Sequence, residues 1–152
     1  MNSDTGLSFI LKHSILINKN REAVWDFTQD YSRRHLWDKS VWKAAETRED
    51  NNRVARLAMK GKTTMTFVYK LDDRPNKTTL VAREIKSPLV TAAGGSWSYT
   101  ENSGGTLWEQ TNSITIQNTF FTRLLFSFIK KMFNARMKQS MNLAKKMIES
   151  TK

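Results

Sequence analysis

Alternating apolar and polar positions run through most of the chain and predict β-strands. From Leu7 to Ile17, nearly every second side chain is apolar, which is the pattern of a strand with one buried face. The alternation recurs at several places within residues 41–117, where residues 61–62, 72–76 and 101–105 have the composition of turns. We therefore expect about six further strands, joined by short connections into an antiparallel sheet.

The hydrophobic period changes from that of a strand to that of a helix in two regions. Asn20 is a suitable N-cap for a short helix in which Val24 and Phe27 share one face, and a second short helix is expected before Trp37. Residues 119–150 contain neither Pro nor Gly and predict one helix of about 30 residues. Such a helix is roughly 45 Å long, enough to cross a whole sheet.

The C-terminal helix is amphipathic when its residues are placed at about 100° intervals. The expected apolar face consists of Leu125, Phe128, Ile129, Met132 and Leu143. The expected basic face, nearly opposite, consists of Arg123, Lys130, Lys131, Lys138 and Lys145. The helix is therefore expected to close the sheet with one face and to present positive charge with the other.

The order of these elements, together with particular residues, resembles the SRPBCC superfamily of START-like proteins, which includes polyketide cyclases and birch-pollen-allergen-like proteins. The residues that carry the resemblance are the strand 14–18, the following segment 21–27 with Asp30, then Trp37, and the Gly105-Thr106 pair at the start of the last strand. The resemblance covers about residues 7–148. Asp38-Lys39 departs from it, since many members have Pro after the Trp.

The resemblance implies an α+β helix-grip fold, with residues 1–152 as a single START-like ligand-binding domain. In this fold a curved antiparallel sheet of about seven strands, with two short helices after the first strand, wraps the long C-terminal helix around an apolar cavity. Family members hold lipids, sterols, quinones, polyketides or hormones there, and a minority catalyse reactions. The fold alone does not decide which of these applies.

Composition is consistent with one folded domain: the chain has 152 residues, of which 39% are apolar and 26% charged. The absence of Cys excludes disulfides, thiolate metal sites and a thiol nucleophile. No apolar run is long enough for a transmembrane helix. Residues 1–6 lack the features of a signal peptide, so a cytoplasmic location is expected.

The apolar faces of the predicted elements supply candidates for the wall of a cavity. From the strands these are Leu57, Met59, Phe67, Tyr69, Trp97, Tyr99 and Trp108; from the helix they are Leu125, Phe128 and Met132. Aromatic and Met side chains suit a flat or flexible apolar ligand. The same residues could equally form an ordinary packed core.

Polar residues on these apolar faces are candidates for contacts to a ligand. Gln110 and Asn112 follow the alternation of the last strand inward, unless a bulge rotates them outward. Arg136 lies within the apolar stripe of the helix, where it could anchor a ligand anion, pair with Glu84 or extend outward to solvent. Of Arg83 and Glu84, which are adjacent, one is expected to face the cavity.

Binding or carriage of a small apolar ligand, such as a lipid, quinone or polyketide that could be anionic, is the favoured function. The alternative is a polyketide-cyclase-like enzyme that uses Arg136 with Tyr69 or Tyr99. His13 is expected to be a core residue and His35 to lie near the cavity mouth. Neither has further ligands at metal-binding spacing, so no metal or cofactor is expected.

Positive charge is concentrated in the C-terminal segment. The net charge is +11, and residues 119–152 contain eight basic residues and one acidic residue, Glu149. The basic helix face could simply be solvated, or it could meet an anionic membrane surface, with Phe120, Phe121, Leu124 and Leu125 entering the bilayer. Those four side chains could instead be buried against the sheet. Nucleic acid is a less favoured partner.

Overall fold

The computed structural model describes residues 5–151. The strands are β1 Leu7–Ile17, β2 Val41–Glu49, β3 Asn52–Met59, β4 Thr63–Asp73, β5 Lys77–Lys86, β6 Val90–Asn102 and β7 Gly105–Ile116. The helices are α1 Arg21–Thr28, the 3-10 helix η1 Tyr31–Arg33, α2 Arg34–Trp37, α3 Phe120–Leu124 and α4 Phe126–Ser150. Residues 1–4, part of the segment in which no signal peptide is expected, lie outside the described residues.

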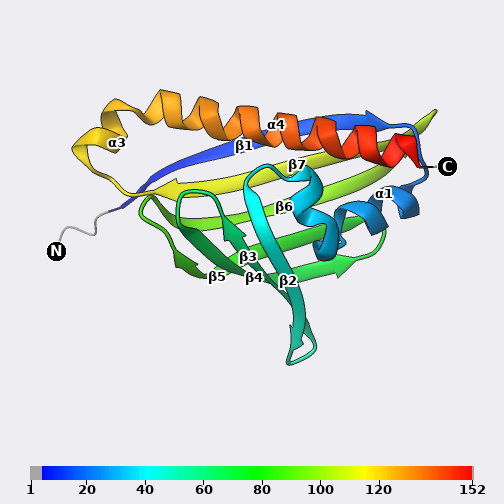
Figure 1. Ribbon diagram of the computed structural model, residues 1–152, viewed down its shortest axis with the longest axis horizontal. Coiled ribbons are helices and arrows are strands. Elements are labelled where there is room, and N and C mark those ends of the chain that lie inside the picture. The colour runs from blue at the N-terminus through cyan, green and yellow to red at the C-terminus, as the bar shows by residue number, and fades with distance from the viewer. Residues whose placement is uncertain (1–4, 152) are drawn as a thin grey trace.

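The seven strands form one antiparallel sheet in the order β1-β7-β6-β5-β4-β3-β2. The chain reaches the far edge of the sheet through α1, η1 and α2, and then returns strand by strand until β7 pairs with β1. Figure 1 shows the sheet curving beneath α4, which runs along β1 and β7. The expected α+β helix-grip fold is confirmed.

The first strand and helix form as the hydrophobic pattern predicts. Phe9, Leu11 and Ile17 are buried on one face of β1. The side chain of Asn20 caps α1 by accepting a hydrogen bond of 2.8 Å from the amide of Ala23. The cap satisfies an amide that has no partner within the helix, and thus determines where the helix begins.

The C-terminal segment differs from its prediction, because it forms two helices rather than one. The backbone leaves the helical conformation at Leu125, which has φ −97° and ψ 8°. After the break, the rings of Phe126 and Phe133 pack on Phe9 at 5.7 and 5.8 Å between centroids. Leu125 and Phe128, both expected to face the sheet, are 47% and 65% exposed instead.

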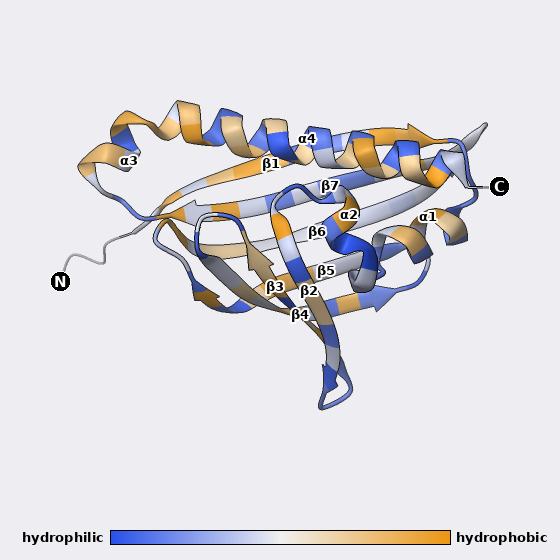
Figure 2. Ribbon diagram, in the orientation of Figure 1, coloured by the Kyte–Doolittle hydropathy of each residue, from blue (hydrophilic) through white to orange (hydrophobic). Residues whose placement is uncertain are grey.

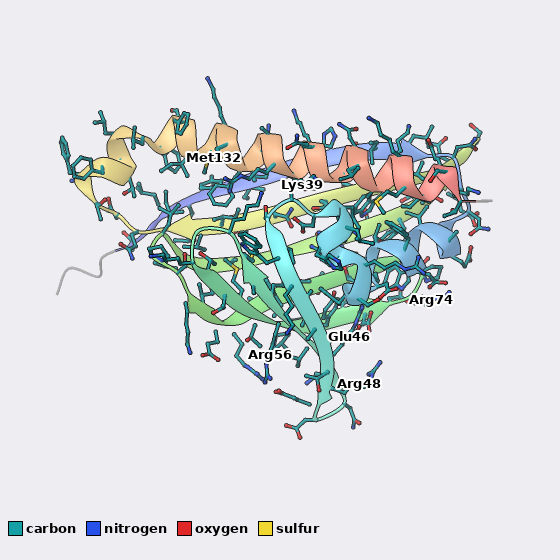
Figure 3. The ribbon with its side chains drawn as sticks, in the orientation of Figure 1. Lys39, Glu46, Arg48, Arg56, Arg74 and Met132 are labelled. Atoms are coloured by element: carbon teal, nitrogen blue, oxygen red, sulfur yellow. The ribbon has the colours of Figure 1, made fainter. Side chains whose placement is uncertain are left out.

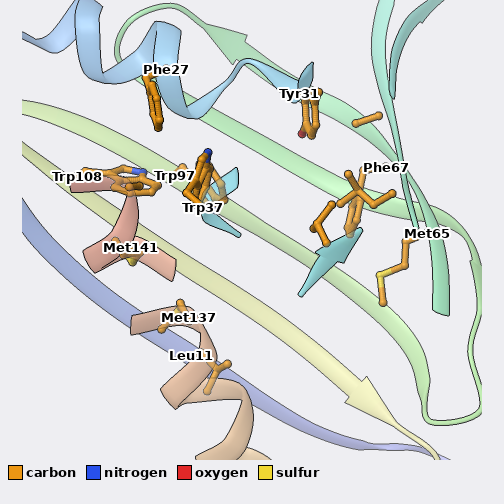
Figure 4. Close-up of a cluster of buried hydrophobic side chains, with 14 of the residues drawn as sticks. Leu11, Phe27, Tyr31, Trp37, Met65, Phe67, Trp97, Trp108, Met137 and Met141 are labelled. Carbon is orange, nitrogen blue, oxygen red and sulfur yellow. The ribbon is translucent and has the colours of Figure 1, made fainter. Parts of the chain in front are cut away.

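The core is densest at the end of the sheet that α1 and α2 cover. Trp37, Trp97 and Trp108 pack there with ring centroids 5.4–6.1 Å apart, and Figure 4 shows Met141 of α4 lying against this group. Edge-to-face contacts of this kind stabilise beyond the area they bury. In Figure 2 apolar and polar residues alternate along α4, and α3 is apolar in large part.

Candidate functional site

A cavity of about 440 Å³ lies between the concave face of the sheet and the first half of α4. Its volume is within the range of roughly 300–1,000 Å³ found for small-molecule pockets. Apolar side chains from β3, β4, β6 and β7 form most of the wall, because strand alternation directs them to the concave face. The cavity extends to the β3–β4 turn at Gly61 and the β5–β6 loop at Pro88.

Most of the candidate ligand-binding residues lie in the cavity lining. Those that line the cavity are Leu57, Met59, Phe67, Trp97, Gln110, Asn112, Met132 and Arg136. Met132 occupies the early part of α4, whereas Glu46, Arg48 and Arg56 lie on the β2–β3 hairpin away from that helix (Figure 3).

Three candidates from the sheet are buried but do not line the cavity. Tyr69 donates a hydrogen bond of 3.1 Å to Oε1 of Gln29, and its hydroxyl also bonds that of Tyr31. The hydroxyl of Tyr99 accepts from Nε2 of Gln29 at 2.8 Å, and Trp108 stacks on the Tyr99 ring. These side chains fill the packed end of the sheet.

The buried tyrosines are poorly suited to proton transfer with a cavity ligand. Burial and the neighbouring Tyr31 raise the pKa of Tyr69 well above its ordinary value, although Arg53 opposes the shift. Burial likewise raises the pKa of Tyr99, outweighing its hydrogen bonds to Thr28 and Gln29. Both hydroxyls are therefore engaged, protonated and outside the cavity lining, so the expected pairing of Arg136 with either tyrosine is wrong.

Gln110 and Asn112 face the interior as the alternation predicts. Strand β7 pairs with β1 without a register shift from Thr106 to Ile116, so no bulge rotates them outward. Asn112 donates to Oε1 of Gln110 at 3.0 Å and accepts a long contact of 3.5 Å from Nε1 of Trp97. Within residues 5–151, the amide nitrogen of Gln110 donates no hydrogen bond, so a donor is left at the cavity wall.

Arg34 is a charged residue of the cavity that the sequence reading missed. Its guanidinium lies 4.6 Å above the Trp97 ring and 4.8 Å above the Trp37 ring, and its Nε donates to Asp38 at 2.8 Å. Burial acts to lower the pKa of Arg34, but the Asp38 carboxylate together with Tyr31 and Tyr69 outweighs burial, and the pKa is raised. The polar context of Arg33-Arg34 suggests a surface, and only the i, i+4 spacing to Asp38 indicates the pair.

Arg136 provides a second guanidinium at the cavity, and it differs from Arg34 in its burial and its partners. It is half-buried, and it makes neither a hydrogen bond nor an ion pair with any other residue in the described part of the chain. The alternative of an Arg136–Glu84 pair is wrong, because Glu84 is exposed and lies 3.7 Å from Lys86. Arg83 is also exposed and binds Glu49 at 2.7 Å, so neither member of the Arg83-Glu84 pair faces the cavity.

Several other lining residues were not anticipated. The cavity side of α4 also contains Phe133, Met137 and Ser140. The buried stripe continues through Met141, Ala144 and Ile148, about a quarter turn from the face predicted for one unbroken helix. Their i, i+3 and i, i+4 spacing was the available signal, but small and polar members such as Ser140 and Ala144 concealed it.

Two histidines and the described acidic residues provide no site for a metal. In residues 5–151, no group of three His, Cys, Asp or Glu side chains could hold a metal ion. His13 is half-buried on β1, and burial together with Lys138 lowers its pKa. His35 is exposed and does not line the cavity.

Comparison with protein families agrees with this architecture. The model of the family described as polyketide cyclase / dehydrase and lipid transport matches residues 8–149, nearly the whole chain. The chain belongs to the polyketide cyclase/dehydrase and lipid transport family. The resemblance to START-like proteins stated from the sequence is confirmed, and a comparison with curated proteins found no match.

Solved structures similar to this family member share its fold at low sequence identity. An aromatase/cyclase from a Streptomyces species is 14% identical, with a TM-score of 0.77 and 94% of each chain covered. A START superfamily protein from Mycobacterium smegmatis is 10% identical, with a TM-score of 0.75, and the match covers 92% of this chain and 97% of that one. The di-domain aromatase/cyclase BexL is 15% identical with a TM-score of 0.76; the match covers 96% of this chain but only 52% of BexL.

Proposed function

We propose that the protein binds and carries a small apolar molecule with an acidic group in the cavity between the sheet and α4. Apolar side chains around a small space also occur in ordinary packed cores, so the volume of the cavity alone does not support the proposal. The observation that carries it is the guanidinium of Arg136, which lies at the wall of an apolar cavity and has no partner within residues 5–151. A half-buried cation without a counter-ion is costly, and a ligand carboxylate or phosphate would supply the missing partner.

The other charges of the cavity favour an anionic ligand as well. The lining contains Arg34, Lys60 and Arg136 but only one acidic residue, Asp38, which Arg34 neutralises. The cavity therefore retains an excess of positive charge after its internal pair is counted. Gln110 adds an amide donor for a carbonyl or hydroxyl of the same ligand. The apolar wall would hold the rest of the molecule.

The test compares a long-chain fatty acid with its methyl ester, which has the same tail but no charge, by isothermal titration calorimetry. The native protein is expected to prefer the acid. Arg136→Met should weaken acid binding by about tenfold or more, since a charge-assisted hydrogen bond is lost, and should leave the ester unaffected. Lys131→Met, on the exposed side of the same helix, is the matched control.

A second variant tests the contribution of the cavity volume separately from that of the Arg136 charge. Ala93 lines the cavity, and Ala93→Phe should fill part of it and weaken the acid and the ester alike. Equal binding of acid and ester by the native protein, or acid binding that Arg136→Met leaves unchanged, would remove the anionic ligand from the proposal. Mass spectrometry of the purified protein would identify a ligand carried through purification.

A polyketide-cyclase-like reaction is the second candidate, favoured by the family and by a tyrosine in the cavity lining. Tyr31 lines the cavity beside Arg34, and its hydroxyl bonds that of Tyr69. In an aldol closure, a new C–C bond forms while the proton of the nucleophilic carbon passes to the carbonyl oxygen; the arginines could stabilise the enolate. Turnover of a poly-β-ketone that Tyr31→Phe and Arg136→Met both reduce would support this function; unchanged turnover would exclude this mechanism.

A further inference from the structure

A group of large apolar side chains is exposed where the chain leaves the sheet and enters the C-terminal helices. We call it the docking patch, and it consists of Phe120, Phe121, Leu124, Leu125 and Phe128. These side chains are 47–70% exposed although they fall within nine consecutive residues. Apolar side chains scattered singly on a surface are ordinary, but a contiguous group of five marks an interaction site.

The local structure holds the docking patch away from the core. Thr119 and Thr122 cap α3 reciprocally, and Oγ1 of Thr122 also donates to the carbonyl of Gln117 at 2.6 Å. None of the residues of α3 is buried. In Figure 1 this helix lies beyond the end of the sheet, and Figure 2 colours most of its residues as hydrophobic. The exposure is therefore a consequence of an ordered helix, and no part of the described chain covers it.

The charged residues of α3 and of the first half of α4 are all basic. Arg123 lies within the patch, and Lys130 and Lys131 follow it on α4; all three are exposed. The sequence contains no acidic residue between Glu109 and Glu149. Exposed aromatic and aliphatic side chains interleaved with basic ones are the composition of helices that lie in the interface of an anionic bilayer. A protein partner of similar fit would need an acidic rim around an apolar groove.

The docking patch lies at the end of the molecule where the cavity reaches the surface. The amide of Gln117, two residues before the cap of α3, donates to the carbonyl of Leu89 at 2.9 Å. Leu89 and its neighbour Pro88 line the cavity, and Lys60 lines it from the β3–β4 turn. The same end thus carries the apolar patch, its basic residues and the loops that border the cavity.

We propose that the protein docks on anionic lipid membranes through α3 and the start of α4, with the docking patch in the bilayer interface and its basic residues at the lipid headgroups. In this orientation the loops that border the cavity face the bilayer. The proposal goes beyond ligand binding and does not depend on it, because the patch lies outside the cavity lining.

The experiment is co-sedimentation with vesicles of phosphatidylcholine alone and of equal parts phosphatidylcholine and phosphatidylserine, at low and high salt. The native protein should bind the mixed vesicles at least about tenfold more tightly, and salt should weaken this binding. Phe121→Ser with Leu124→Ser should reduce binding by about tenfold or more, because the buried apolar area is lost. Arg123→Gln with Lys130→Gln should remove most of the preference for phosphatidylserine.

Ile10→Ser with Val81→Ser is the matched control, since both are exposed apolar side chains on the sheet, in β1 and β5, at 64% and 42%. This control should bind vesicles like the native protein, and calorimetry with the fatty acid should give the same affinity for all variants. Equal binding by native protein and the Phe121/Leu124 variant would overturn the proposal. Two other results would also overturn it. The native protein could form a dimer in sedimentation velocity that the Phe121/Leu124 variant abolishes, with no binding to vesicles. Alternatively, the native protein could bind an oligonucleotide but not vesicles.

Discussion

At the scale of the residue, the two arginines of the cavity differ in their partners as well as in their burial. Arg34 is stacked between tryptophans and paired with Asp38, so its charge is part of the structure. Arg136 has a place in the wall but no partner within residues 5–151, so its charge is available. Removing one member of a buried pair leaves the other charge unsatisfied, whereas removing an unpaired charge does not.

We therefore expect Arg34→Met to lower the free energy of unfolding by about 2–4 kcal/mol, because it leaves the Asp38 carboxylate unpaired in a mostly buried position. Arg136→Met should change it by less than about 0.5 kcal/mol or increase it. Urea denaturation of both variants measures the difference. Similar losses for both would show that Arg136 has a structural partner as strong as that of Arg34.

His13 should make stability depend on pH in a defined direction. Its pKa is lowered in the folded protein by burial and by Lys138, so the unfolded chain takes up a proton first as the pH falls. The contribution of His13 to stability is thus present above about pH 6.5, its unfolded pKa, and is lost as the pH falls toward the folded pKa. Urea midpoints at about pH 7.5 and about pH 5.5 should differ less in His13→Gln than in the native protein. His35→Gln, at an exposed position, should keep the native difference.

At the scale of the element, alternation predicted the strands well because a strand has only two faces. Apolar or amide side chains occupy every second position of β7 from Trp108 to Ile116, and the structure places these alternate residues inward as expected. The helical face was less predictable because no Pro or Gly announces the break at Leu125. The side of α4 that faces the sheet includes Phe126 and Phe133, which contact Phe9, a residue distant in sequence. Burial of Arg34 likewise depends on tertiary partners that no local pattern specifies.

The two glycines of the β6–β7 turn allow a matched test of how backbone conformation and close contacts determine the turn. Gly105 has φ +147°, and a Cβ there would lie 2.0 Å from the carbonyl oxygen of Ile17. Gly104 has φ +99°, but a Cβ there would meet open space. Gly105→Ala should therefore cost about 3 kcal/mol or more in the free energy of unfolding, because the backbone is strained and the end of β1 must move. Gly104→Ala should cost about 1 kcal/mol from strain alone.

At the scale of the whole molecule, α4 divides the protein into a packed end and a hollow end. Its second half places Met141, Ala144 and Ile148 against the sheet with almost no exposure. Its first half places Met132, Phe133 and Arg136 around the cavity. The packed end contributes most of the close contacts of α4, whereas the hollow end has room for a ligand. A ligand that fills the hollow end would stabilise the whole molecule by mass action.

Substitution of two methionines of α4 tests whether its two halves differ in packing. Met141→Ala should lower the free energy of unfolding by about 2–5 kcal/mol, because it opens a cavity in a close-packed region. Met132→Ala should lower it by less than about 1 kcal/mol, because the side chain already borders empty space and loses few contacts. Urea denaturation in the absence of ligand compares them. If both variants lost the same free energy, the two ends of α4 would be equally well packed, and there would be no room for a ligand beneath Met132.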